Sequence, residues 1–297
     1  MRQLEACPIT GATDLEPLFN CKDFTVTGET FPIVQCKSSG FIFTNPVPAE
    51  DEIARYYASE EYISHSNTRK GFMSWLYQRV RKYTLNQKAR WIRQETGTHQ
   101  GNFLDIGCGT GEFLQHMNRK GWRGQGLEPS EKARSFAQNT YNLPVAPPEE
   151  LFNLAAGKFR LITMWHVLEH VHQLNAYMEQ LHTLLADDGL LVIAVPNCNS
   201  HDAEYYKAHW AAWDVPRHLY HFTADTMKLL AGKHGFNVFR LQRMPFDSYY
   251  VSLLSEKYLH GKPRYVSAFL KGWKSNREAR RNVARSSSIT YFLRKEA

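Results

Sequence analysis

The chain has 297 residues, of which 43% are hydrophobic, and its formal net charge is +7. This length suffices for one large domain with additions or for two small ones, and the composition is typical of a soluble globular protein. No apolar run approaches the roughly 18 residues of a membrane span, the first residues lack the apolar core of a secretory signal, and the five cysteines are scattered. These features exclude a membrane-spanning chain and a disulfide framework, and we expect a cytoplasmic protein with no membrane partner.

Residues 1–45 have the pattern of a small separate module. Cys7 and Cys36 each begin a turn like the two knuckles of a zinc ribbon, in which a second cysteine follows three positions later. Here a threonine and a serine occupy those second positions, and neither is a usual zinc ligand. We expect a ribbon-like module whose hairpins form without a metal ion. The alternative is that Cys21 and a histidine complete a metal site.

Residues 46–98 are predicted to form a helical lead-in to the main domain. Two prolines mark a linker at 46–48. The ranges 49–58 and 72–95 have apolar residues at helical spacing.

The next segment, residues 103–111, reads FLDIGCGTG and predicts a buried strand, a glycine turn and the start of a helix near Glu112. Its glycines alternate along the turn, so no Cβ stands between the backbone and a ligand, and positive φ angles are accessible. The helix over 112–120 directs its N-terminus at the same place. Asp105 ends the strand with an acid, which would repel the pyrophosphate of a dinucleotide but suits a cationic ligand.

A second strand over 122–128 also ends in an acid, Glu128, and Pro129 precedes the next helix. Because the glycine turn after Asp105 is followed by a second strand that ends in an acid, the sequence resembles the class I S-adenosylmethionine-dependent methyltransferases. The first motif of that family has the form D-x-G-x-G-x-G. The resemblance implies S-adenosyl-L-methionine as the cofactor, with Asp105 near its amino group and Glu128 accepting from its ribose hydroxyls. The residues implied to contact the cofactor are Asp105, Gly107, Cys108, Gly109, Gly111, Glu128, Pro129 and His166.

Strands and helices continue to alternate after this motif, which predicts an α/β fold with a Rossmann-like parallel sheet. The predicted strands are 102–106, 122–128, 143–146, 159–166, 190–195 and 235–241. A last strand over 286–294 is implied by the resemblance to run antiparallel beside the sixth. We expect the ligand crevice at the carboxyl ends of the strands, where Asp105, Glu128, His166 and Asn197 fall.

These predictions divide the chain into four parts. They are a degenerate zinc-ribbon-like module over 1–45, a helical lead-in or lid over 46–98, a cofactor-binding core over 99–245 with a substrate insert at about 197–223, and a basic helical segment with the final strand over 246–297. Some members of the resembling family carry an N-terminal zinc ribbon and a helix that closes over the cofactor. Tyr56, Tyr57 and Tyr62 are candidates to line such a lid, although aromatic packing in a core is the commoner role.

Residues 166–170 read HVLEH and formally match the H-x-x-E-H signature of one class of zinc proteases. That signature requires a helix, whereas a predicted strand runs into His166, so we expect no metal here. The resemblance implies instead the loop after the fourth strand, with His166 touching cofactor or substrate. Glu169 and His170 are expected to hold this loop.

The insert contains a run over 207–223 that combines two tryptophans, an acid, an arginine and three histidines. Its D-x-P-R-H-x-x-x-F pattern is similar to a subgroup of small-molecule methyltransferases. We predict His218 or His221 as the general base, with His166 as a further catalytic candidate. The predicted substrate-binding residues are Trp210, Trp213, Asp214 and Arg217. The alternative is a structural ion pair between the acid and the arginine, with the histidines capping the helix that begins at Thr223.

Charge is distributed unevenly along the chain. The stretches 62–94 and 262–285 carry +8 and +7, which leaves −8 on the remainder. An acidic core fits a cationic cofactor, and the basic stretches either attract an acidic substrate or are solvated helix faces.

We therefore predict an enzyme that methylates a small acidic or sugar-containing metabolite on oxygen or carbon. The alternatives are an RNA methyltransferase that uses the basic stretches and a cofactor-binding protein without turnover. RNA is disfavoured because an Asn-Pro-Pro-Tyr type of loop does not follow the fourth strand.

Overall fold

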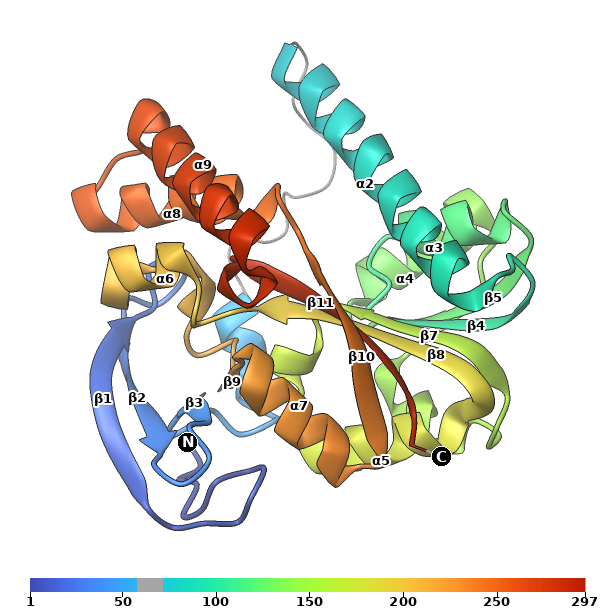
Figure 1. Ribbon diagram of the computed structural model, residues 1–297, viewed down its shortest axis with the longest axis horizontal. Coiled ribbons are helices and arrows are strands. Elements are labelled where there is room, and N and C mark those ends of the chain that lie inside the picture. Colours follow the sequence, from blue (N-terminus) through green and yellow to red (C-terminus); the bar gives the residue numbers. More distant parts are fainter. Residues whose placement is uncertain (58–71, 297) are drawn as a thin grey trace. The chain divides into compact units, whose positions relative to one another are not determined.

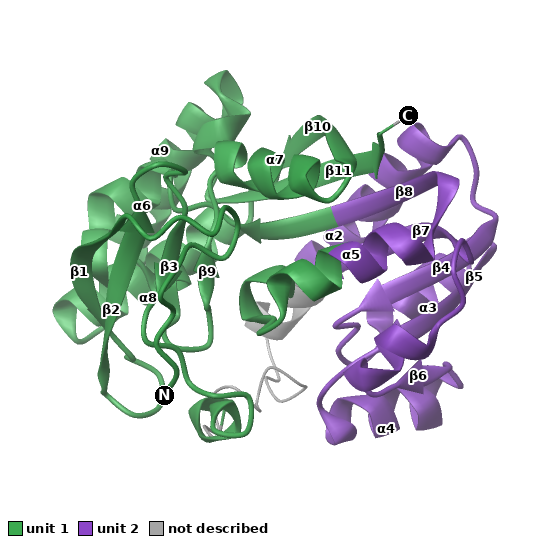
Figure 2. Cartoon of the chain, turned by 90° about the horizontal axis from the view of Figure 1, so that it is seen from below, with its two compact units in different colours: residues 1–62, 166–178, 193–296 green, residues 63–165, 179–192, 297 purple. Residues whose placement is uncertain are grey.

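The computed structural model describes residues 1–57 and 72–296. By its internal contacts the chain forms two compact units, which Figure 2 shows in different colours. Unit 1 comprises Met1–Tyr62, His166–Met178 and Ile193–Glu296, and unit 2 comprises Ile63–Trp165 and Glu179–Val192. The predicted lid residue Tyr62 lies outside the described residues.

Unit 2 is built on short parallel strands. β4 (Gly101–Ile106) pairs in parallel with β5 (Trp122–Leu127) and β7 (Phe159–Trp165), and β5 pairs in parallel with β6 (Val145–Ala146). β4 and β7 are almost wholly buried, as expected for strands covered on both faces. The helices of this unit are α2 (Phe72–Thr96), α3 (Glu112–Asn118), α4 (Glu131–Tyr141) and the 3-10 helix η2 (Pro148–Asn153).

Glycines in unit 2 allow a helix to pack closely on the sheet. A Cβ at Gly124 would lie 2.4 Å from Leu114 Cδ1, and a Cβ at Gly126 would lie 2.5 Å from Cys108 Sγ. Real Cβ atoms do not approach other atoms so closely, so β5 needs glycine at both positions for α3 and the glycine turn to lie where they do.

The main sheet has seven strands in the order β10-β11-β8-β7-β4-β5-β6. β8 (Leu185–Pro196) belongs partly to each unit, and α5 (Leu174–Leu184) precedes it. β10 (Phe236–Arg243) and β11 (Ser288–Lys295) are antiparallel to each other. The predicted α/β fold, with its Rossmann-like parallel sheet and antiparallel last strand, is confirmed.

Unit 1 contains a second, antiparallel sheet in the order β1-β2-β3-β9 (Figure 1). β1 (Leu15–Lys22), β2 (Thr30–Cys36) and β3 (Ile42–Thr44) come from the N-terminal segment, whereas β9 (Tyr220–His221) comes from the predicted substrate insert. Ile42 pairs with His221 in this register. The N-terminal segment therefore shares a sheet with the insert, a long-range pairing that local sequence pattern does not indicate.

Side chains of the insert also share a hydrophobic core with the N-terminal sheet. The buried members of this core include Phe31 and Ile33 from β2, Tyr56 from η1 (Ile53–Tyr57), and Trp210 and Trp213 from the insert. The predicted helix over 49–58 is reduced to the 3-10 turn η1.

The two knuckle-like turns are held by hydrogen bonds. Cys7 Sγ lies 3.4 Å from Ser39 Oγ, and Cys36 Sγ lies 3.3 Å from Asp14 Oδ1. Burial raises the pKa of Cys21 to about 12, and its thiol donates to the carbonyl of Ala208. The relationship to a zinc ribbon stays a prediction.

Helices complete unit 1. They are α6 (His201–Tyr206), α7 (Ala224–Lys233), α8 (Asp247–His260), α9 (Tyr265–Arg281) and the 3-10 helices η3 (Leu168–His170), η4 (Lys207–His209), η5 (Ala211–Trp213) and η6 (Val283–Arg285). Among the residues that the structure describes, no helix is long and apolar enough to cross a membrane.

Candidate functional site

Two glycines of the unit 2 turn have different structural roles. Gly107, Gly109 and Gly111 have φ angles of 67°, 55° and 82°, which residues other than glycine rarely adopt. A Cβ at Gly109 would meet nothing within 4 Å, whereas a Cβ at Gly111 would lie 2.7 Å from Leu143 Cδ1. Gly109 therefore leaves the backbone open to a ligand, and Gly111 allows close packing.

The carboxylate of Glu128 lies against this turn, directly after β5. Its Oε2 accepts the N–H of Gly109 at 2.8 Å, and its Oε1 accepts the N–H of Ser130 at 2.9 Å. Ser130 is the N-cap of α4, and the exposed Pro129 joins it to Glu128. Each carboxylate oxygen keeps a further lone pair that can accept from a ligand hydroxyl.

Asp105 lies at the end of β4, in register with Gly126 of β5. Its side chain is 2% exposed, and Thr163 donates to its Oδ1 at 2.5 Å. Burial raises the pKa of Asp105 to about 7, although the bond from Thr163 opposes the rise. The charge of Lys88 also opposes the rise, but among the described residues none forms an ion pair with Asp105, so a cationic ligand would supply a direct counter-charge. Burial also raises the pKa of the neighbouring Cys108 thiol.

His166 follows β7 and has a φ of 59°, a conformation that is uncommon outside glycine and often found at functional positions. Its ring is 35% exposed and lies between two carboxylates. Nε2 is 3.1 Å from Asp247 Oδ2, and Nδ1 is 3.4 Å from Glu169 Oε1. Burial opposes protonation of this ring, but the hydrogen bond to Asp247 and the ion-pair contact with Glu169 raise its pKa to about 10.

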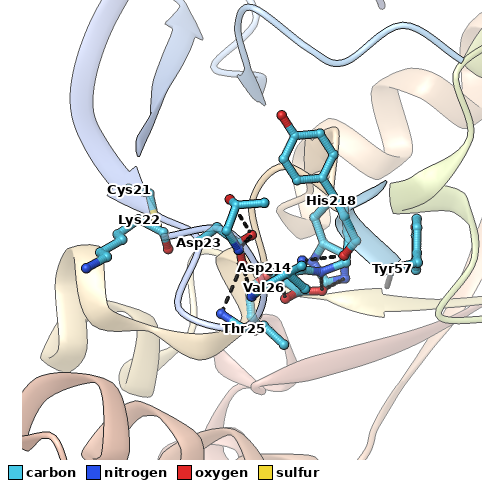
Figure 3. A network of polar contacts seen from close by, with 12 residues as sticks. Cys21, Lys22, Asp23, Thr25, Val26, Tyr57, Asp214 and His218 are labelled. Carbon is cyan, nitrogen blue, oxygen red and sulfur yellow. Dashed lines mark hydrogen bonds and ion pairs between the residues drawn. The ribbon is translucent and has the colours of Figure 1, made fainter. Parts of the chain in front are cut away.

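Arg217 occupies the centre of a buried polar network in unit 1. Its side chain is 1% exposed and donates to Asp214 at 2.7 and 3.1 Å, to Asp23 at 3.0 Å and to the carbonyl of Tyr56 at 2.8 Å. Figure 3 shows Asp23, Asp214 and His218 of this network from close by. An ion pair between Arg217 and Asp214 is the structural role that we gave from the sequence as the alternative to substrate binding. Asp23 adds a second carboxylate to this pair.

The two tryptophans of the insert are buried, and each indole N–H is satisfied. Trp210 donates to Asp202 at 2.8 Å, and Trp213 donates to the carbonyl of Lys207 at 2.8 Å. Both rings therefore contribute to the core of unit 1. Their assignment to substrate binding stays a prediction.

The candidate bases of the insert are also buried. His218 Nδ1 lies 2.9 Å from the carbonyl of Ala212, and His221 Nε2 lies 3.2 Å from Thr44 Oγ1. Burial, and then the neighbouring His218, lower the pKa of His221 well below its usual value. Neither ring caps α7, because Thr223 and Thr226 form a capping box there.

Comparison with known proteins identifies the family. Residues 65–241, more than half of the chain, match the model of a family described as a methyltransferase domain. The chain belongs to this methyltransferase family.

The solved structures most informative about this methyltransferase share its fold. An S-adenosylmethionine-dependent methyltransferase from Archaeoglobus fulgidus is 18% identical, with a TM-score of 0.50 over 72% of this chain and 94% of its own. A 1,6-didemethyltoxoflavin-N1-methyltransferase from Burkholderia thailandensis, solved with S-adenosylhomocysteine, is 15% identical, with a TM-score of 0.51 over 95% of this chain and 100% of its own. At these identities the likeness concerns the fold alone.

Curated relatives match a shorter part. A ubiquinone biosynthesis O-methyltransferase from Bordetella avium is 28% identical over 120 residues, which are 38% of this chain and 50% of the relative. One from a Caulobacter species is 32% identical over 101 residues, which are 32% of this chain and 40% of the relative. The chain thus spans about half or less of the length of these relatives.

The methyltransferase is of class I and uses S-adenosyl-L-methionine, and the unit 2 site fits that cofactor. The open backbone at Gly109 gives room for a bound group, the two oxygens of Glu128 suit a ribose diol, and Asp105 lacks a counter-ion that an ammonium group would supply. The structure brings together in unit 2 the predicted residues Asp105, Gly107, Cys108, Gly109, Gly111, Glu128 and Pro129. Their individual contacts with the cofactor stay predictions.

Sequence reasoning missed three partners of the predicted site residues. Thr163 bonds Asp105, Asp247 bonds His166, and Asp23 bonds Arg217. Thr163 had a usable signal, because a polar residue inside the buried strand β7 needs a hydrogen-bond partner. Asp23 and Asp247 carry no local signal, since their partners are distant in sequence.

Proposed function

We propose that this methyltransferase transfers the methyl group of S-adenosyl-L-methionine to an oxygen atom of a small metabolite. The observation that carries the proposal is the pairing, in unit 2, of an open glycine turn with two largely buried carboxylates, Asp105 and Glu128, which are 2% and 8% exposed. Oxygen as the acceptor is supported by the names of the curated relatives, which are O-methyltransferases. A fold alone does not determine a substrate.

Each of the two carboxylates has a chemical task in this proposal. The cofactor, when bound, supplies a methyl group already activated on sulfonium, so the protein contributes position and charge. Asp105 holds the ammonium group of the methionine portion, and Glu128 holds the ribose hydroxyls. The contact of Asp105 favours a cationic nucleoside over a dinucleotide, whose pyrophosphate this carboxylate would repel, whereas the ribose contact of Glu128 would suit either.

An oxygen acceptor must also lose its proton. His218 and His221 remain the predicted bases, with His166 as the third candidate, and single changes of each to Ala with turnover as the readout test these assignments. Since protein groups already saturate the guanidinium of Arg217, we propose that Arg217 and Asp214 position the insert from within, while contact with substrate stays a prediction for them and the tryptophans.

The experiment that tests the proposal is transfer of a labelled methyl group from S-adenosyl-L-methionine into cell extracts fractionated into small molecules, RNA and protein. We expect label in the small-molecule fraction, and loss of it in Glu128→Ala. The matched control is Glu149→Gln, an exposed acid of the same unit, which keeps activity.

Two outcomes would contradict the proposal. Label in RNA, with an affinity that falls steeply with salt, would favour the RNA alternative. Tight cofactor binding with no transfer into any fraction would favour a binding protein without turnover.

A further inference from the structure

Two buried side chains and a half-buried one form a cluster in unit 1 with the donor set of a metal site. Glu169 and His170 lie in η3, and His218 lies in the insert just before β9. One ligand atom from each lies within 4.8 Å of the others. Imidazole nitrogens and a carboxylate are the donors that bind divalent transition-metal ions.

Backbone carbonyls orient the two imidazole rings. His170 Nδ1 lies 3.0 Å from the carbonyl of Arg217, and His218 Nδ1 lies 2.9 Å from the carbonyl of Ala212. Because a carbonyl oxygen only accepts, each Nδ1 carries the proton, and the lone pair of each neutral ring is then on Nε2. The hydroxyl of Tyr57 is 3.0 Å from His170 Nδ1 and adds to the orientation of that ring. Donation of Nδ1–H to a carbonyl is how proteins hold histidines that bind a metal through Nε2.

Glu169 gives an independent indication of a missing partner. Its side chain is 0% exposed, and neither carboxylate oxygen accepts a hydrogen bond from the described residues. The ion-pair contact with His166 Nδ1, at 3.4 Å, involves Oε1 alone. The His166 ring therefore balances part of the charge of Glu169 at Oε1, whereas Oε2 is buried with no partner among the described residues, and a bound cation would supply one.

We propose that Glu169, His170 and His218 bind one divalent transition-metal ion of the zinc class, through the carboxylate of Glu169 and Nε2 of each histidine. Two imidazoles with one carboxylate match known three-ligand sites that leave a position open for water or substrate, and they favour transition ions over calcium or magnesium. From the sequence we expected no metal here, because residues 166–170 offered only an H-x-x-E-H motif that requires a helix. His218 comes from the insert, 48 positions beyond His170, so the cluster exists only in the fold.

The open position suggests what the ion would do. An ion of this class lowers the pKa of a hydroxyl bound to it, which is the requirement of an oxygen acceptor. This use rests on the proposed function, whereas binding of the ion does not. His218 would then act as a ligand and not as a base.

The test is a titration of the full chain, stripped with EDTA and returned to chelator-free buffer, with Zn²⁺ by calorimetry and with Co²⁺ by absorption. We expect one ion per chain, cobalt d–d bands and no thiolate charge-transfer band. In Glu169→Gln and His218→Ala the affinity should fall at least tenfold. The control His209→Ala removes a histidine whose ring lies beside Phe24, and it should bind as the wild type does.

The wild-type titration alone can overturn the proposal, even where a variant does not fold by circular dichroism. Absence of stoichiometric binding contradicts it, as does a thiolate band, which would place the ion on cysteine. Equal affinity in folded Glu169→Gln or His218→Ala also contradicts it. No cofactor or acceptor is present in this experiment, so its result is independent of whether the proposed methyl transfer is found.

Discussion

Both units bury carboxylates, but they balance the charge differently. In unit 1 the carboxylates of Asp23 and Asp214 flank the guanidinium of Arg217, and the bonds to Arg217 hold the pKa of each carboxyl below its usual range despite burial. In unit 2 Asp105 has one hydroxyl partner, and burial raises its pKa to about 7. The first arrangement is complete within the protein, whereas we propose that a cationic ligand completes the second. This difference separates a structural network from a binding site.

We expect the largest loss of stability when the guanidinium of Arg217 is removed. Arg217→Met should destabilise the protein by roughly 3–5 kcal/mol, because it leaves two carboxylates buried without their partner. Urea unfolding measures this loss. Arg281, which is exposed and pairs with Glu278 at 3.6 Å, provides the control. Arg281→Met should cost less than about 1 kcal/mol, and equal losses in the two variants would remove the distinction.

Asp105→Asn should change stability in the opposite direction. Below about pH 3 the carboxyl is protonated in folded and unfolded chains alike, but above pH 7 the folded chain must hold a buried charge. Wild-type stability should therefore fall as pH rises between the unfolded value of 3.8 and the folded value of about 7. This difference in pKa between the folded and unfolded chains corresponds to a loss of at most about 4 kcal/mol in the free energy of unfolding.

The measurement is urea unfolding at pH 4 and pH 8, without cofactor. Asp105→Asn should lack the fall and be the more stable protein at pH 8, yet bind S-adenosyl-L-methionine at least tenfold more weakly. A variant that is less stable than the wild type at pH 8 would show that Asp105 serves the fold.

Two glycine variants sharpen the comparison within unit 2. Gly111→Ala places a Cβ 2.7 Å from Leu143 Cδ1 at a φ of 82°, so it should cost roughly 1–3 kcal/mol of stability. Gly109→Ala meets no neighbour within 4 Å at a φ of 55°, so about 1 kcal/mol is expected. Thermal unfolding with and without cofactor checks both. Gly109→Ala should lose the stabilisation by cofactor, whereas a normal response would mean that this backbone does not face the ligand.

The parts of the fold that could be predicted from the sequence are those made by neighbouring residues. The strand, turn and helix over 103–128 place both acids and all three glycines, because each lies at the end of a local element. The Arg217–Asp23 contact spans 194 positions, and β9 is only two residues long, so neither leaves a periodic pattern.

The same limit explains the candidate metal cluster. Glu169 and His170 are adjacent, but the third member, His218, lies 48 positions beyond His170, just before β9. The burial of the insert's tryptophans and Arg217 was also not predictable, because composition does not show which side chains a distant sheet will cover. The tryptophans share a core with the N-terminal sheet, and Arg217 bonds Asp23, which follows β1.

The most direct test of the cofactor site is calorimetric titration of the intact chain with S-adenosyl-L-methionine, S-adenosylhomocysteine and NAD. The two nucleosides should bind with one site per chain, and NAD should give no heat. Tight binding of NAD, with no heat from either nucleoside, would contradict the assignment of Asp105, Gly109 and Glu128 to a cationic nucleoside.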